Sequence, residues 1–218
     1  MDSNTFDHVL TILQAEAGNW HAPVITLVSE RSKDPYQILI STLLSLRTKD
    51  ETTIEASRKL FTEADTPKNM LMLSAEKIRG LIYPVGFYKV KADNILKISS
   101  IIMEKYDGSV PDTMEGLLSL PGVGRKTANL VITLGFGKPG ICVDTHVHRI
   151  TNRLGYVATK TPDETEWALR EKMPEKWWIP ASEILVAFGQ SVCRPLSPFC
   201  SRCAVKKWCG RKGVVRSR

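Results

Sequence analysis

Four cysteines near the C-terminal end of the chain constrain its fold more than any other feature of the sequence. They form the pattern Cys193-x6-Cys200-x2-Cys203-x5-Cys209, which places four thiols within seventeen residues. The chain holds five cysteines, and an odd number without a secretion signal argues against a framework of disulfides. Metal ligation by four thiolates on one compact loop is therefore the expected role.

Zinc and a [4Fe-4S] cluster are the two candidates for this metal. Structural zinc sites commonly pair two Cys-x-x-Cys knuckles or add histidines. This chain has one such knuckle, Cys200 with Cys203, and no histidine after position 148. Because the two wider gaps suit the larger span of a cubane cluster, the spacing favours [4Fe-4S] and leaves zinc as the alternative. Cys142 lies in an apolar run and is expected to be free and buried.

Basic charge is concentrated in the same C-terminal segment. The chain carries 30 Lys and Arg against 23 Asp and Glu, a formal net charge of +7. Eight basic residues and no acidic ones lie from Arg194 to Arg218, so the preceding residues are close to neutral overall. Such a block can bind nucleic acid or an anionic membrane, or it can be a solvated tail.

The pattern of apolar residues and caps predicts an all-α protein. Apolar residues recur mostly at helical spacing. Asp34-Pro35 and Thr161-Pro162 each place a capping side chain before a proline at the first helical position, and Thr161 with Glu164 fits a capping box. The length of 218 residues allows one large or two small domains. Because a signal peptide and a long apolar run are both lacking, we expect a soluble, intracellular protein.

The segment LPGVGRK, residues 120–126, lies between two expected helices over 114–120 and 125–134. Gly122 and Gly124 allow a tight turn around Val123, and the backbone N–H groups that open the second helix at Arg125 can face an anion. This pattern predicts a helix-hairpin-helix that holds a DNA backbone without reading its sequence. An ordinary helical hairpin is the alternative.

Lys126 lies in the first turn of the second of these helices. The helix dipole disfavours an ammonium charge at this end, and an amine must be neutral to act as a nucleophile. A lysine at this position therefore lowers the stability of the helix and favours a neutral, nucleophilic amine. A solvated lysine without a chemical role is the simpler alternative.

Asp144 follows the apolar run 141–143 and precedes an expected helix, so it is expected to cap that helix. His146 and His148 are two residues apart and should diverge on the helix. They are therefore not expected to bind a metal together.

Three motifs together resemble the endonuclease III family of DNA glycosylases with lyase activity. They are the hairpin LPGVGRKTA over 120–128, the segment VDTHVHRITNRLG over 143–155, and the four-cysteine spacing. The resemblance runs over roughly residues 28–209 and implies that Lys126 is the nucleophile and Asp144 the catalytic carboxylate. It also implies that the four cysteines hold a structural [4Fe-4S] cluster, and that the following residues contact DNA: Gly122, Val123, Gly124, Arg125, His146, Arg149 and Arg194 with its loop up to Phe199.

The fold implied by this resemblance is the helix-hairpin-helix DNA glycosylase fold, with two all-α domains. A six-helix barrel with the hairpin would span 28–138, and a cluster domain would combine 1–27 with 139–218. Lys126 and Asp144 would then face each other across the cleft between the domains. The expected partner is double-stranded DNA with damaged bases or abasic sites, bound by a monomer without membrane association. The expected location is the cytoplasm of a prokaryote, at the nucleoid.

Two further residues are expected to enter the base stack of the DNA. Arg47, in LLSLRTKD over 43–50, occupies the place where typical family members have a glutamine that fills the gap left by the extruded base. Phe87, in VGFYKVKA over 85–92, resembles the wedge of the family's second intercalating loop. Both residues are therefore expected to contact DNA.

The reaction implied by the resemblance is removal of oxidised pyrimidines, followed by β-elimination through a lysine Schiff base. The pair Arg47-Thr48 looks more like the archaeal thymine-mismatch glycosylases, so uracil or thymine opposite guanine is the alternative substrate. A non-catalytic iron-sulfur protein that binds DNA is a third hypothesis. It leaves the presence of both Lys126 and Asp144 unexplained.

Overall fold

The structure is a computed structural model that describes residues 1–20 and 32–218. Every regular element in these residues is helical, so the all-α prediction is confirmed. They form two compact units, one combining the N-terminal residues with Pro139–Arg218 and the other extending to Lys138. The expected domain boundary between residues 27 and 28 lies outside the described residues. In the described ranges, no helix is both long enough and apolar enough to cross a membrane.

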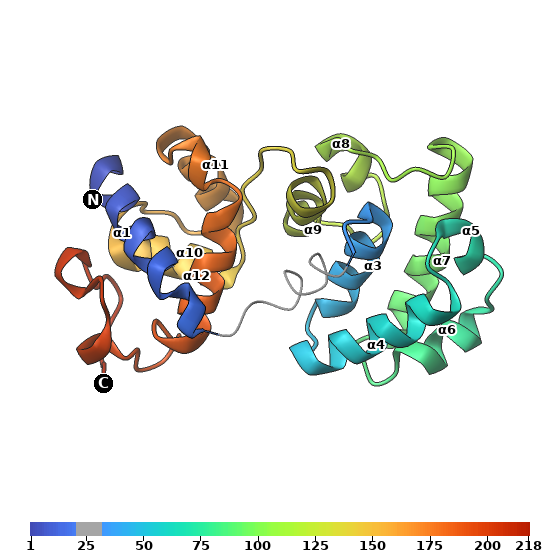
Figure 1. Ribbon diagram of the computed structural model, residues 1–218, viewed down its shortest axis with the longest axis horizontal. Helices are drawn as coiled ribbons and strands as arrows, with labels where there is room; N and C mark the ends of the chain where they lie inside the picture. Colours follow the sequence, from blue (N-terminus) through green and yellow to red (C-terminus); the bar gives the residue numbers. More distant parts are fainter. Residues whose placement is uncertain (21–31) are drawn as a thin grey trace. The chain divides into compact units, whose positions relative to one another are not determined.

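The unit that ends at Lys138, here called the hairpin unit, packs its helices around an aliphatic core (Figure 1). Buried Leu39, Ile95 and Val131 belong to this core. Its described elements are α3 (Pro35–Ser45), α4 (Asp50–Glu63), α5 (Pro67–Met70), α6 (Ala75–Ile82), α7 (Tyr88–Lys105), α8 (Met114–Leu118), α9 (Arg125–Leu130) and the π-helical turn η2 (Val131–Gly135).

Local sequence signals place the helices of the hairpin unit. Asp34 Oδ1 accepts hydrogen bonds from the N–H groups of Tyr36 and Gln37 at 2.8 and 3.0 Å, so α3 begins where the cap predicts. The expected helix over 114–120 ends two residues early, at Leu118. The expected helix over 125–134 is α9 continued by η2.

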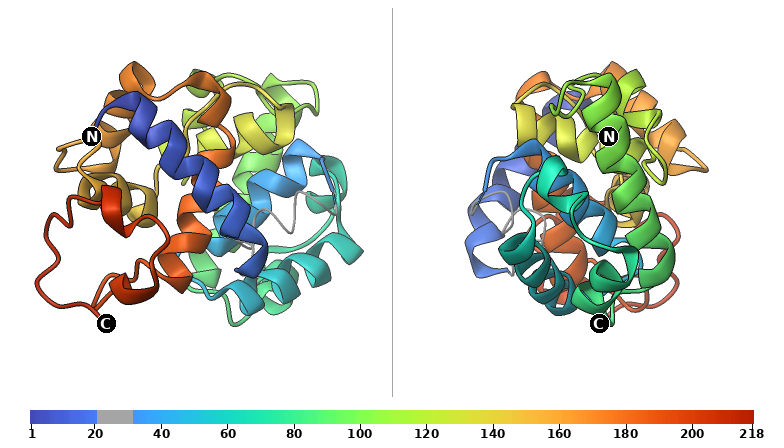
Figure 2. Two further views of the ribbon diagram at one scale, coloured as in Figure 1. Left: turned by 60° about the vertical axis from the view of Figure 1, so that its left-hand side comes forward. Right: turned by 90° about the vertical axis from the view of Figure 1, so that its right-hand side faces the viewer.

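The second unit, here called the cysteine unit, combines the N-terminal helix with the last third of the chain. Its described elements are α1 (Ser3–Glu16), η1 (Ala17–Asn19), α10 (Thr145–Leu154), α11 (Pro162–Lys172), η3 (Glu175–Trp177), α12 (Pro180–Ser191), η4 (Cys200–Arg202) and η5 (Lys206–Trp208). Helix α1 lies alongside α12 (Figures 1 and 2). The Phe6 ring stacks on Tyr156 with centroids 3.8 Å apart, which attaches the N-terminal helix to this unit.

The capping box predicted at Thr161 forms only in part. Thr161 Oγ1 accepts a hydrogen bond from the Glu164 N–H at 3.2 Å, and α11 begins at the next residue, as expected. The Glu164 carboxylate, however, accepts from the N–H of Lys160 at 2.9 Å, one residue before the cap. The N-cap at Thr161 is therefore confirmed, whereas the N–H of Thr161, the expected partner of the Glu164 carboxylate, is wrong.

Candidate functional site: a hairpin, a lysine and a four-cysteine pocket

The hairpin turns between α8 and α9 through a left-handed glycine. Gly122 has φ +78°, a conformation that side chains rarely adopt. The Val123 N–H donates to Leu120 O at 3.2 Å, which closes the turn. Gly124 is the N-cap residue of α9, and among the described residues no side chain caps this helix. Gly124 therefore places no side chain beside the first backbone N–H groups of α9.

Lys126 is the second residue of α9, and its side chain is exposed. Its neighbours Thr127 and Ala128 are buried in the hairpin unit, so the helix is anchored directly behind the lysine. Arg125 is half-buried beside it. The lysine is thus an exposed residue on a fixed helical turn.

Asp144 caps α10 in the cysteine unit. Its Oδ1 accepts hydrogen bonds from the N–H groups of His146 and Val147 at 2.8 and 2.9 Å, as the N-cap prediction requires. The other carboxylate oxygen, Oδ2, takes part in neither bond. Two backbone donors therefore fix the orientation of a half-buried carboxylate.

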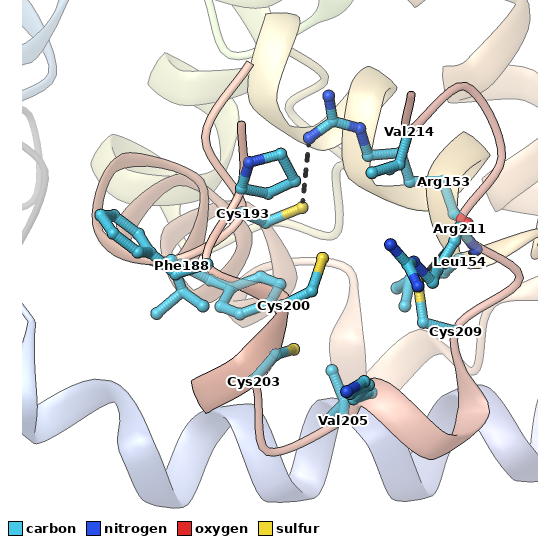
Figure 3. Close-up of a pocket in the computed structure, with 14 residues that line it drawn as sticks. Arg153, Leu154, Phe188, Cys193, Cys200, Cys203, Val205, Cys209, Arg211 and Val214 are labelled. Carbon is cyan, nitrogen blue, oxygen red and sulfur yellow. Dashed lines mark hydrogen bonds between the residues drawn. The ribbon is translucent and has the colours of Figure 1, made fainter. Parts of the chain in front are cut away.

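Cys193, Cys200, Cys203 and Cys209 line one pocket of the cysteine unit. Figure 3 shows their four thiols pointing into the same space, with Phe188, Val205 and Val214 among the apolar residues around them. In residues 1–20 and 32–218, no three His, Cys, Asp or Glu side chains are grouped so that they could hold a single metal ion. The four predicted ligands are thus gathered around a pocket rather than around one point.

Burial affects the protonation of two of these thiols. It raises the pKa of Cys203 to about 11 and raises the pKa of Cys209 above its ordinary value. Burial therefore favours the protonated form of both thiols. A metal that binds them has to displace these protons.

Arg153 holds the loop after Cys193 in place. Its side chain is only 8% exposed and donates to the carbonyls of Arg194 and Pro195, both at 2.6 Å. Its Nη1 also donates to the Sγ of Cys193 at 3.5 Å (Figure 3). The sequence analysis missed this residue, although it follows Arg149 by four positions and so lies on the same side of α10.

Arg149 and His146, both expected to contact DNA, contact each other and other residues of the cysteine unit. Arg149 Nη2 donates to Cys193 O at 2.9 Å and to Gly189 O at 3.3 Å, and lies 3.1 Å from His146 Nδ1. Burial lowers the pKa of the Arg149 guanidinium. His148 contacts Thr165 instead, so the two histidines diverge as expected. The role of His146 and Arg149 at DNA stays a prediction.

Three arginines surround the ring of Phe199. The guanidinium carbons of Arg194, Arg202 and Arg218 lie 5.1, 4.2 and 5.1 Å from the ring centroid. All three side chains are exposed. Phe199, at the end of the loop expected to contact DNA, therefore gathers positive charge from that loop and from two segments outside it.

Arg47 and Phe87, which are forty residues apart in sequence, lie close together in the hairpin unit. The guanidinium carbon of Arg47 is 5.6 Å from the centroid of the Phe87 ring. Both residues have left-handed backbones, with φ 54° and 58°. Lys91, which was not among the residues predicted from the sequence, donates to backbone carbonyls of the Arg47 loop. Its position among Ile95, Ile98 and Ile102 on one face of α7 was the available signal.

Comparison with known proteins identifies the family. The model of the HhH-GPD superfamily of base excision DNA repair proteins matches residues 40–175. Endonuclease III of Thermotoga maritima is 49% identical over 195 residues, which cover 87% of this chain and 92% of that protein. The chain belongs to the endonuclease III family.

Other similar proteins agree with this assignment. Endonuclease III of Escherichia coli is 36% identical over 181 residues, covering 83% of this chain and 86% of that protein. A solved non-covalent endonuclease III–DNA complex matches with a TM-score of 0.86 and 30% identity, over 96% of this chain and 95% of that one. A thermostable thymine-DNA glycosylase shares the fold, with a TM-score of 0.81 and 23% identity, over 95% of this chain and 96% of that one.

Membership of the endonuclease III family settles two predictions. The helix-hairpin-helix DNA glycosylase fold is confirmed by the family model and by the structural match. As a family member, the chain is a DNA glycosylase and lyase of base excision repair.

Proposed function

We propose that this endonuclease III family member removes oxidised pyrimidines from double-stranded DNA and then cuts the abasic strand through a Schiff base on Lys126. The observation that carries the proposal is the position of Lys126, an exposed residue in the first turn of α9, two residues after the Gly124 cap. A similar solved structure is an endonuclease III–DNA complex, and another is a trapped covalent intermediate of endonuclease III with DNA. Chromosomal DNA is the substrate, which in a prokaryote lies in the nucleoid.

The hairpin binds the DNA backbone, and the damaged nucleotide leaves the base stack. Phosphate oxygens approach the start of α9 at Gly124, where the backbone N–H groups and the helix dipole favour an anion. Arg47 and Phe87 fill the space from which the nucleotide is extruded. Because a damaged base unstacks at lower cost than a normal one, this step adds selectivity.

The chemistry then proceeds at C1′ of the extruded nucleotide. The neutral Nζ of Lys126 attacks C1′ as the bond from C1′ to the base nitrogen breaks, and the base leaves with that electron pair and takes up a proton. Asp144 stabilises the cationic sugar and accepts the proton that Lys126 loses. The sugar ring opens to a Schiff base, and loss of a C2′ proton expels the 3′ phosphate oxygen, which cuts the strand.

The four cysteines fit a [4Fe-4S] cluster. Such a cluster binds four thiolates around a core larger than a single ion, and the four thiols line one pocket with apolar walls. Cys193, Cys200, Cys203 and Cys209 would hold it. When bound, the cluster supplies a structural crosslink that fixes the loop bearing Arg194.

Borohydride trapping tests the role of Lys126. The protein is mixed with duplex DNA that contains thymine glycol or an abasic site, and the reductant converts the Schiff base into a stable covalent complex. Lys126→Gln should abolish the complex, whereas Lys68→Gln, which also removes an exposed lysine of the hairpin unit, should leave it unchanged. Trapping by the Lys126→Gln variant would overturn the assignment.

Arg47 favours a second candidate function, removal of uracil or thymine opposite guanine. A guanidinium carries donors that match the acceptor atoms of guanine, and the contact with Phe87 holds this one at the surface of the hairpin unit. Excision rates on thymine glycol, G·U and G·T duplexes distinguish the two functions. Inactivity on thymine glycol together with activity on the mismatches would replace the first proposal with the second.

A further inference from the structure

The loops that carry Arg47 and Phe87 are in direct contact. The Gly86 N–H donates to Thr48 Oγ1 at 3.1 Å. A Cβ at Gly86 would lie only 2.5 Å from the carbonyl oxygen of Arg47, so only glycine allows this approach. The two exposed side chains therefore project from a single joined surface of the hairpin unit.

Lys91 lies directly behind this junction. It is one turn along α7 from Phe87, and the residue is only 8% exposed. Its Nζ donates to Leu44 O at 2.9 Å and to Leu46 O at 2.6 Å. These carbonyls lie at the C-terminal end of α3, which ends at Ser45, where the helix has unbonded carbonyls and the negative end of its dipole.

Thr48 connects the two parts of the junction. Its Oγ1 accepts from Lys91 Nζ at 3.3 Å and from the Gly86 N–H, and it lies within donating distance of Leu46 O at 3.3 Å. One donor and two acceptors are the full capacity of a hydroxyl group. Thr48, Gly86 and Lys91 thus form one connected set of contacts, here called the loop clasp.

The buried ammonium is costly for folding. Burial lowers the pKa of Lys91 to about 8, which means that the surroundings disfavour its charged form. A methionine would have a similar length without this cost. Packing alone therefore does not explain a lysine on the apolar face of α7, whereas the acceptor oxygens of the Arg47 loop do.

We propose that Lys91 and Thr48 are positioning residues that hold Arg47 and Phe87 together as one wedge for duplex DNA. This inference rests on the proposed function, because it takes both side chains to enter the base stack. A wedge acts only where a base stack has to be opened and filled. The clasp should therefore matter for duplex DNA and have no effect on single strands.

The test compares binding of an uncleavable abasic analogue in duplex and in single-stranded DNA. Lys91→Met and Thr48→Val should each weaken duplex binding about tenfold, because a wedge misplaced by about an ångström loses most of its effect. Single-strand binding should stay unchanged. Lys97→Met removes an exposed lysine farther along α7, and Thr48→Ser keeps the hydroxyl, so both controls should bind duplex as the unmodified protein does.

Hydrogen exchange of the Gly86 amide gives a second readout that needs no DNA. Exchange should be faster in Thr48→Val than in Thr48→Ser, because only serine keeps the acceptor of this N–H. If Lys91→Met does not fold, the two Thr48 variants carry the test. Equal duplex-to-single-strand binding ratios in Thr48→Val and Thr48→Ser would overturn the proposal.

Failure of the clasp and failure of the proposed function give different results. If the unmodified protein binds the duplex analogue but neither excises oxidised pyrimidines nor forms a trapped complex, the proposed function fails. The binding ratios still decide the clasp in that case. If excision and trapping occur but the ratios do not change in the variants, only the clasp fails.

Discussion

The two hairpin glycines, Gly122 and Gly124, should respond in opposite ways to the same added methyl group. At Gly122, φ is +78°, and alanine in this left-handed conformation costs about 1–2 kcal/mol. Its Cβ would also lie 2.8 Å from Asn94 Nδ2, so the amide of a half-buried side chain has to move. We expect Gly122→Ala to lower the free energy of unfolding by about 1–3 kcal/mol.

Gly124 provides the matched control two residues away. It has φ −101° and ψ 177°, which alanine adopts freely, and no atom of the residues that the structure describes lies within 4 Å of an added Cβ. Alanine reduces the entropy of the unfolded chain, a gain of about 0.4–1 kcal/mol. It is a poorer N-cap than glycine by a similar amount, about 0.5–1 kcal/mol. The two effects offset each other, so Gly124→Ala should leave stability almost unchanged.

Thermal unfolding and DNA binding together test this reasoning. For a chain of this size, 1 kcal/mol corresponds to about 2–4 °C in Tm, so Gly122→Ala should lower Tm by about 2–12 °C. Gly124→Ala should keep its Tm within about 2 °C and yet bind duplex DNA more weakly, because its methyl group lies where we propose that the phosphate approaches α9. Equal changes in Tm for the two variants would refute the account of the turn.

Three further predictions concern the cysteine unit. Cys200→Ser should reduce the iron and sulfide content of the purified protein, measured by chemical analysis; full retention of both would contradict the assigned ligand. Arg153→Met should accelerate hydrogen exchange in the loop after Cys193, because two carbonyls lose their donor. Unchanged exchange would show that these two hydrogen bonds do not order the loop. Lys176 keeps the pKa of Asp7 below its usual value, so this carboxylate stabilises the fold above the ordinary aspartate pKa and loses that effect as pH falls through its lowered pKa. Asp7→Asn should therefore lower Tm at pH 7 and have progressively less effect toward pH 3, and a pH-independent difference would contradict the ion pair.

Features specified by neighbouring residues could be predicted from the sequence. The cap at Asp34 depends on an oxygen and two N–H groups within three residues, and the same applies to the cap at Asp144. The hairpin turn needs only a left-handed glycine between two short helices. The pocket of four cysteines also follows from short spacing, because thiols within seventeen residues readily reach one another.

Features that depend on where helices end in space could not be predicted. The bonds of Lys91 require α3 to end at Ser45 and α7 to pass directly behind that end. Periodicity marks Lys91 as an exception on an apolar face but gives no information about its acceptors. The predicted partner of the Glu164 carboxylate was wrong for a similar reason, because the path of the chain before Thr161 brings the N–H of Lys160 to the carboxylate.

Lys91 in the hairpin unit and Arg153 in the cysteine unit have the same physical role. Each is 8% exposed, and each donates to backbone carbonyls of a loop whose exposed side chains are proposed to contact DNA. An irregular loop has carbonyls that no helix satisfies, and a cation can bond several of them at once. A neutral donor could also satisfy a carbonyl, but a cation also places positive charge directly beneath a surface that is proposed to bind DNA. Replacing either residue with methionine should therefore affect loop order and duplex affinity more than overall stability.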